Sequence, residues 1–163
     1  MIIREATHDD RSQMADILNP IIVAGGTTAY QDPLEPAYFN RFLDDPDPKV
    51  FLHVAQTEMG LQGLQWMSPL DPQHPHIGSI ATFARPDTVQ KGVGTALFAK
   101  TRQTSVDVGY TTLYAIIRAD NTGGLAYYEK MGFRDHSREL AVPLKDGTPV
   151  DRITKRLMLD DTP

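Results

Sequence analysis

Residues 77–95 read IGSIATFARPDTVQKGVGT, in which an apolar segment is followed by two closely spaced glycines. The segment Ile77 to Ala84 is rich in apolar and β-favouring residues, which predicts a buried central strand. The region Gly92 to Val108 repeats small and apolar residues at spacings of three or four, which predicts a helix packed on a sheet. The predicted order is therefore strand, glycine loop and helix.

The glycine loop, residues 90–95, comprises Gln90, Lys91, Gly92, Val93, Gly94 and Thr95. Free amide groups and the dipole at a helix start favour phosphate, and glycines let the backbone approach the anion closely. An isolated pair of glycines more often forms a plain strand-to-helix turn. A mononucleotide P-loop needs four residues between its glycines and then Lys with Ser or Thr, which this segment lacks. A dinucleotide fingerprint fits poorly as well, because Leu97 occupies the place of its third small residue.

A second informative helix is marked by both of its ends. Asp120 or Asn121 can cap its start, and Gly132 followed by the apolar Phe133 is typical of a left-handed helix stop. The helix is expected over residues 122–131. Tyr128 within it would, on structural grounds alone, be an ordinary core aromatic residue with its hydroxyl satisfied.

The flanking sequence predicts further strands and helices on both sides. Strands are expected at residues 2–6, 50–56, 61–67, 111–118, 133–142 and 149–159. One helix should start after Thr7 and end at Pro20, and another should cover Pro33 to Leu43. The last two strands enclose Asp146-Gly147, which is a hairpin turn signal. This pattern predicts an α/β or α+β fold around one mixed sheet.

Composition restricts the class of protein. A chain of 163 residues, with 40% hydrophobic and 23% charged residues, fits one folded domain over residues 1–163. The net charge of -5 opposes binding to nucleic acid. Cysteine is absent, which excludes thiol intermediates and thiolate metal sites, and we expect no metal. Neither a leader pattern nor an apolar run of about 18 residues occurs, so we expect a cytoplasmic protein without membrane contact.

The glycine loop and the second helix together resemble the GNAT N-acetyltransferases. That family's pattern is Gln/Arg-x-x-Gly-x-Gly/Ala after one strand and, a strand later, Asn followed by Tyr-x-Lys-x-Gly-Phe. The matching residues here are Val89-Gln90-Lys91-Gly92-Val93-Gly94, Asn121 and Tyr128-Glu129-Lys130-Met131-Gly132-Phe133. Residues 3–7 and 17–30 also look like the phosphinothricin-type branch. The resemblance implies a single GNAT-like domain whose mixed, mostly antiparallel sheet of about seven strands is flanked by about four helices.

The resemblance also implies that acetyl-CoA is the acetyl donor and suggests which residues hold it. The main chain of Thr82, Phe83 and Ala84 should contact the pantetheine arm. The loop from Val89 to Gly94, continued by Thr95, should hold the pyrophosphate, and Asn121 should contact the cofactor. Val89 stands where the family usually has Gln or Arg, a departure that removes side-chain contacts but keeps the backbone amides.

Acetyl transfer from a thioester needs a neutral amine, stabilisation of the oxyanion and a proton for the departing thiolate. It needs no protein nucleophile, which agrees with the missing cysteine. Tyr128, in the family's acid position, is the candidate proton donor. The base is left open, because Ser79 stands where phosphinothricin-type relatives carry a glutamate. His76 is the candidate base, with a water chain as its main competitor.

The acceptor pocket is the least constrained part of the prediction. Tyr30 and Trp66 are its candidates, although each suits a plain core equally well. The resemblance implies acetylation of a primary amine in a small, amino-acid-like or antibiotic-like molecule. The alternative is a module that binds coenzyme A without turnover, which Val89 and Ser79 keep open. The acceptor, the acyl length and the choice between monomer and homodimer are left undecided.

Overall fold

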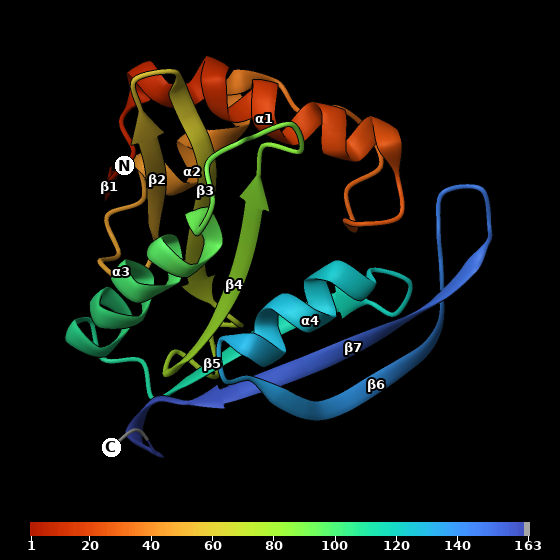
Figure 1. The fold of residues 1–163 in the computed structure, drawn as a ribbon. Helices are drawn as coiled ribbons and strands as arrows, with labels where there is room; N and C mark the ends of the chain where they lie inside the picture. Colours follow the sequence, from red (N-terminus) through yellow and green to blue (C-terminus); the bar gives the residue numbers. More distant parts are fainter. Residues whose placement is uncertain (162–163) are drawn as a thin grey trace.

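A seven-stranded sheet lies at the centre of this computed structural model, which describes residues 1–161 (Figure 1). The strand order is β1-β2-β3-β4-β5-β7-β6, and every neighbouring pair is antiparallel except β4 and β5. The expected mixed, mostly antiparallel sheet with four helices is confirmed. The strands are β1 (Ile2–Glu5), β2 (Phe51–Thr57), β3 (Gly60–Pro69), β4 (Ile77–Ala84), β5 (Thr112–Arg118), β6 (Arg134–Pro143) and β7 (Pro149–Met158).

Helices cover both faces of the sheet. They are α1 (Arg11–Ala24), α2 (Asn40–Leu43), α3 (Val93–Asp107) and α4 (Thr122–Lys130), with short 3-10 helices η1 (His8–Asp10), η2 (Pro36–Phe39) and η3 (Leu159–Asp161). Within residues 1–161, none of them is long and apolar enough to cross a membrane.

Alternate residues of β2 and β3 face α1 on one side and α3 on the other. Leu52, Val54 and Leu64 are buried in the cluster that includes α1, whereas Ala55 packs with α3. Helix α3 approaches β3 closely at Gly63, where a Cβ atom would lie 2.7 Å from Val93 Cγ1 and 3.0 Å from the carbonyl oxygen of Phe83. The small residues of α3 and β3 thereby bring the start of α3 next to the carboxyl end of β4.

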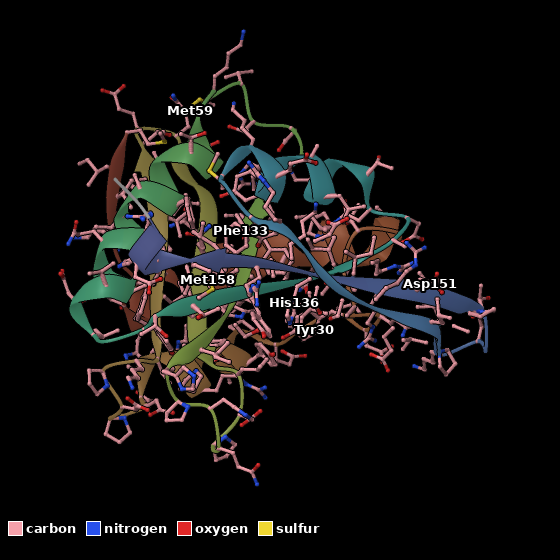
Figure 2. All side chains as sticks on the ribbon, turned by 90° about the horizontal axis from the view of Figure 1, so that it is seen from below. Tyr30, Met59, Phe133, His136, Asp151 and Met158 are labelled. Atoms are coloured by element: carbon pink, nitrogen blue, oxygen red, sulfur yellow. The ribbon has the colours of Figure 1, made fainter. Side chains whose placement is uncertain are left out.

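The other half of the sheet carries α4. Tyr128 and Phe133 are buried against Leu113, Ala115 and Ile117, the alternate residues of β5 on that face. The hairpin of β6 and β7 forms around Asp146-Gly147 as expected and extends beyond the rest of the sheet (Figures 1 and 2). This half supplies one wall of the site described below.

The expectation that Pro20 ends the first helix is wrong, because α1 continues to Ala24. A proline inside a helix removes one backbone hydrogen bond and usually kinks or ends the helix. Pro20 lies on the exposed side, however, where water can satisfy the carbonyl oxygen of Asp16. The buried side chains of Leu18 and Ile22, which flank it, hold the last turn of the helix on the core.

The helix expected over Pro33 to Leu43 is also shorter than predicted. It begins at Pro36 as the 3-10 helix η2 and continues as the single α-helical turn of α2. The residue before a proline avoids the α region, and Glu35 is extended at φ -73° and ψ 151°. Pro36 therefore sets the start, and the buried Phe39 and Phe42 anchor the segment to the core as expected.

Candidate active site

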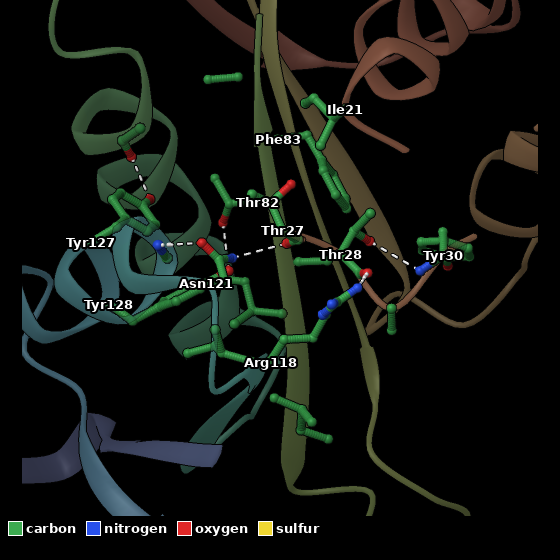
Figure 3. A pocket seen from close by; sticks show the side chains of 18 of the residues that line it. Ile21, Thr27, Thr28, Tyr30, Thr82, Phe83, Arg118, Asn121, Tyr127 and Tyr128 are labelled. Carbon is green, nitrogen blue, oxygen red and sulfur yellow. Dashed lines mark hydrogen bonds between the residues drawn. The ribbon is translucent and has the colours of Figure 1, made fainter. Parts of the chain in front are cut away.

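The site lies where the two parallel strands of the sheet separate. β4 pairs with β5 only through residues 77–79 and 112–114. Beyond that point β4 stays with β3 up to Ala84, and β5 stays with β7 up to Arg118. A cavity of about 590 Å³ opens between them. It is lined by residues 27–30, 80–84 and 116–118, together with α4 (Figure 3).

The glycine loop borders this cavity at the start of α3. Gly92 is the residue before the helix and has φ 78°, a left-handed conformation that favours glycine. No side chain caps this helix start, so the first amide groups of α3 are available to an anion. Gly94 lines the cavity, whereas the Val93 side chain is buried in the core and Val89 is 86% exposed. Val93 can therefore contact a ligand at this loop only through its backbone.

Two adjacent tyrosines of α4 line the cavity. The Tyr128 hydroxyl lies 2.8 Å from Thr82 Oγ1, and the Tyr127 hydroxyl donates to the carbonyl oxygen of Gly94 at 2.8 Å. Gln65, fully buried in β3, donates from Nε2 to Thr82 Oγ1 at 2.8 Å and to the Tyr127 hydroxyl at 3.2 Å. Thr82, which the sequence predicted as a cofactor contact, is thereby joined to the predicted proton donor.

Both phenols stay protonated at neutral pH. Burial raises the pKa of Tyr127 to about 12, although hydrogen bonds from Gln65 and Thr82 act in the opposite direction. Burial also raises the pKa of Tyr128 above the usual tyrosine value. A proton donor must hold its proton until the leaving group needs it, and the site meets this requirement.

The loop after α1 forms the opposite wall and is tied to the end of β5. Asn121 caps α4, since its Oδ1 accepts from Gly124 N at 2.9 Å, and its Nδ2 donates to the Thr27 carbonyl oxygen at 2.9 Å. Arg118 donates to the Thr28 carbonyl oxygen at 3.3 Å and forms an ion pair with Asp120 at 2.7 Å. Asn121, for which a cofactor contact was predicted, joins α4 to the loop that forms this wall (Figure 3).

The two candidate acceptor residues lie in different surroundings. Tyr30 lines the cavity, and its hydroxyl is hydrogen-bonded to that of Tyr38. Trp66 is buried, stacked on Phe42 at a centroid distance of 4.7 Å, and packs behind the lining residues Tyr30 and Phe83 without lining the cavity itself. The structure therefore brings Tyr30 to the site but not Trp66.

The candidate base His76 is also not brought to the cavity. It is exposed and precedes β4, six residues before Thr82, which corresponds to about 20 Å along an extended strand. Ser79 is half-buried at the last pair before the strands separate. Within residues 1–161, no His, Asp or Glu lines the cavity, and no group of such side chains could hold a metal ion.

Several residues that line the cavity or bond to its lining were not predicted. Tyr127 could have been considered, because it adjoins Tyr128 and carries the same hydroxyl. Neither Gln65 nor Arg152 could be identified as a site residue from the sequence. Gln65 is an amide in a mostly apolar strand, and Arg152 is an arginine in the predicted closing hairpin. Each acquires its place only through strand pairing.

A cavity between separating parallel strands, with an uncapped helix start and a buried phenol on its lining, can hold an anionic ligand beside a proton donor. A family model described as the acetyltransferase (GNAT) family matches residues 13–133. The chain therefore belongs to the GNAT family of N-acetyltransferases, whose members use acetyl-CoA as the acetyl donor. No curated protein matches the sequence significantly.

Solved structures agree on the fold. The ribosomal-protein-alanine N-acetyltransferase of Brucella melitensis superposes with a TM-score of 0.88 at 19% identity, over 97% of this chain and 99% of that one. A phosphinothricin acetyltransferase of Sinorhizobium meliloti, solved with acetyl-CoA, gives 0.86 at 20% identity, over 96% and 87%. An N-acetyltransferase of Staphylococcus aureus Mu50 gives 0.86 at 19%, over 97% and 98%. The predicted likeness to phosphinothricin-type enzymes is thus present in the fold.

Proposed function

We propose that this protein acetylates the primary amine of a small molecule, which attacks bound acetyl-CoA directly in a ternary complex. The observation that carries the proposal is that Gly94 of the predicted phosphate loop and the Tyr128 phenol line the same cavity. A donor bound along the loop would therefore bring its thioester to the tyrosine. The Sinorhizobium meliloti relative was solved with acetyl-CoA, which supports this choice of donor.

The residues present suit this donor. Beyond residue 79 the β5-facing edge of β4 has no strand partner among the described residues, so the main chain of Thr82, Phe83 and Ala84 is available to an amide-bearing arm. The uncapped amides from Gly92 to Thr95 would hold the pyrophosphate. Acetyl-CoA supplies the thioester, and the chain binds it, orients it and provides a proton.

Tyr128 provides that proton. As the amine nitrogen bonds to the acetyl carbon, the carbon–sulfur bond breaks and the thiolate takes the proton of the phenol. The amine releases one proton to water, and water returns one to the phenolate, so the proton count balances. Since no His, Asp or Glu side chain within residues 1–161 lines the cavity, water rather than His76 carries the amine proton.

The pH dependence tests this assignment. Replacing His76 with alanine should leave kcat within about twofold, because a histidine so far from the cavity cannot reach the amine. Initial rates of both proteins should rise from about pH 6 to about pH 10, following deprotonation of the acceptor. The raised tyrosine pKa values predict no loss of activity in that range, because the phenols stay protonated. A large rate loss with a shifted profile in His76→Ala would restore the imidazole as base.

An amino-acid-like acceptor is supported by Arg152, which lies opposite Arg118 on β7 and lines the cavity. Arg118 is neutralised by Asp120, whereas Arg152 forms no ion pair or side-chain hydrogen bond with any residue in the described range 1–161. An unpaired guanidinium that lines the same cavity as Tyr128 suits a carboxylate or similar anion on the acceptor.

Replacing Arg152 with glutamine should lower kcat/KM for amino acids about tenfold or more, which corresponds to about 1.4 kcal/mol. Amino acid amides, which lack the carboxylate, should be unaffected. Arg156→Gln, an exposed arginine of the same strand, is the matched control. An equal loss for acids and amides would remove Arg152 from acceptor binding.

The alternative function, binding of coenzyme A without turnover, predicts affinity without chemistry. A screen of the common amino acids, phosphinothricin and simple amines, monitored by release of free thiol from acetyl-CoA, separates the two. Thiol release that depends on an amine supports the transferase. Acetyl-CoA binding in calorimetry with no release for any amine would favour the binding module.

A further inference from the structure

A row of buried polar side chains leads across the sheet to Tyr128. His53, Gln65 and Thr82 lie directly opposite one another on β2, β3 and β4, and they point to the face that carries α3 and α4. His53 and Gln65 are fully buried. Polar groups in an apolar core cost free energy unless they form hydrogen bonds, so such a row needs a reason.

The hydrogen bonds at Thr82 bear on the directions in which the Thr82 and Tyr128 protons point. Its hydroxyl accepts from Gln65 Nε2 at 2.8 Å, and its other partner is the Tyr128 oxygen at 2.8 Å. A threonine hydroxyl has one proton to donate and two lone pairs that accept, so the hydrogen bond between Thr82 and Tyr128 can run in either direction. When Thr82 donates to Tyr128, the proton of Tyr128 is left free to point into the cavity.

The orientation of the Gln65 amide favours this direction, because its donation occupies one of the two lone pairs of Thr82. Nε2 donates to Thr82 and also to Tyr127, whose own proton is used by the Gly94 carbonyl oxygen. Rotating the amide by 180° would place its oxygen against both hydroxyls. Thr82 would then donate to Gln65 and could accept the proton of Tyr128, which would withdraw that proton from the cavity.

His53 lies at the far end of the row, opposite Gln65. Burial lowers the pKa of His53 to about 4, so the ring is neutral at neutral pH. Nδ1 lies 2.9 Å from Thr101 Oγ1. When Thr101 donates to Nδ1, Nε2 carries the proton. Nε2 and Gln65 Oε1 are the two buried side-chain atoms within residues 1–161 that lack a hydrogen-bond partner, and they belong to opposing residues.

We propose that Gln65 is a positioning residue that directs the Tyr128 proton toward the departing thiolate by fixing Thr82 as a donor to the phenol. This role rests on the proposed function of Tyr128. When the phenol gives up its proton to sulfur, the new phenolate oxygen already accepts a hydrogen bond from Thr82, whose oxygen accepts one from Gln65. The row thus stabilises the charge that develops on Tyr128 without supplying a proton.

The test is a double-mutant cycle between Gln65→Met and Tyr128→Phe, assayed with the best amine of the thiol-release screen. Gln65→Met keeps the size of the side chain and removes the amide. It should lower kcat about tenfold or more while the KM for acetyl-CoA changes less than about twofold. In the Tyr128→Phe background it should have almost no further effect, because Gln65 acts through the phenol. Gln56→Met, an amide of β2 bonded to Arg4, is the matched control.

Two further measurements keep the proposal testable if Gln65→Met folds poorly. Thr82→Val removes the hydroxyl and should reproduce the rate loss, whereas Thr82→Ser keeps the hydroxyl and should retain most of the rate. In protein labelled with ¹³C at the tyrosine Cζ, Gln65→Met should shift the Tyr128 resonance and Gln56→Met should not. This NMR measurement needs no acceptor amine.

Additive losses in the cycle, or a Tyr128 resonance unchanged by Gln65→Met, would overturn the positioning role and leave the acetyltransferase function intact. A fully active Tyr128→Phe protein would overturn both the role of Gln65 and the assignment of the proton donor. If the protein releases no thiol with any amine and Gln65→Met still shifts the Tyr128 resonance, the proposed function is refuted and the proposed direction of the hydrogen bond is retained.

Discussion

Replacing Tyr128 with phenylalanine should lower kcat by about a hundredfold or more while the dissociation constant of acetyl-CoA changes less than about twofold. A general acid acts mainly in the transition state, so its loss appears in kcat rather than in donor binding. Steady-state rates of thiol release and calorimetry with acetyl-CoA measure the two quantities separately.

Loss of a buried hydroxyl also affects stability, and this effect has to be separated from catalysis. The Tyr128 hydroxyl is hydrogen-bonded to Thr82 Oγ1, so Tyr128→Phe should cost about 1 to 3 kcal/mol in the free energy of unfolding. Tyr110→Phe is the matched control, because Tyr110 is equally buried and its hydroxyl donates to the Lys49 carbonyl oxygen at 2.7 Å, away from the cavity. A Tyr128→Phe protein with the rate of the wild type would show that Tyr128 serves packing alone.

Replacing Gly94 with valine should raise the dissociation constant of acetyl-CoA about tenfold or more. A Cβ atom at Gly94 would lie 2.7 Å from Tyr127 Cε1, so the tyrosine or the start of α3 has to move. The added methyl groups would also enter the cavity beside the amides proposed to hold the pyrophosphate. Calorimetric titration with acetyl-CoA and with coenzyme A measures the change.

Ala99→Val, on the exposed side of α3, controls for the effect of a β-branched residue on the helix. Thermal unfolding of both variants establishes that the folded protein is being titrated. If Gly94→Val binds acetyl-CoA as tightly as the wild type, the phosphates bind elsewhere and the glycines serve only as a strand-to-helix turn.

The fold was predictable where short-range patterns carry the information. The apolar run of β4, the turn at Asp146-Gly147 and the helix stop at Gly132 each depend on residues a few positions apart. Gly132 has φ 105° and Phe133 is fully buried, as the stop motif predicts. The Pro20 prediction is wrong because a lost hydrogen bond on an exposed helix face is outweighed by burial on the opposite face.

The candidate site was predictable only where it coincides with such a motif. Gly94, Thr82 and Tyr128 were predicted through the resemblance to the family, and all three line the cavity. Trp66 and His76 were chosen from residue type and position, and neither reaches it. Tryptophan and histidine occur in the core, on the surface and in functional sites, so residue type alone could not place Trp66 and His76.

The sequence by itself determined the order of elements, the glycine loop at a helix start and the membership of the chain in its family. Tertiary structure alone decided where β4 and β5 separate, which side chains enter the gap, and that Gln65 joins Thr82 and Tyr127, partners 17 and 62 residues away. The physical reason is the separation in sequence over which each kind of interaction acts. Capping and periodicity are set by neighbours within a few residues, whereas the hydrogen-bond partners of a buried amide are set by the register of strands that meet only when the sheet has formed.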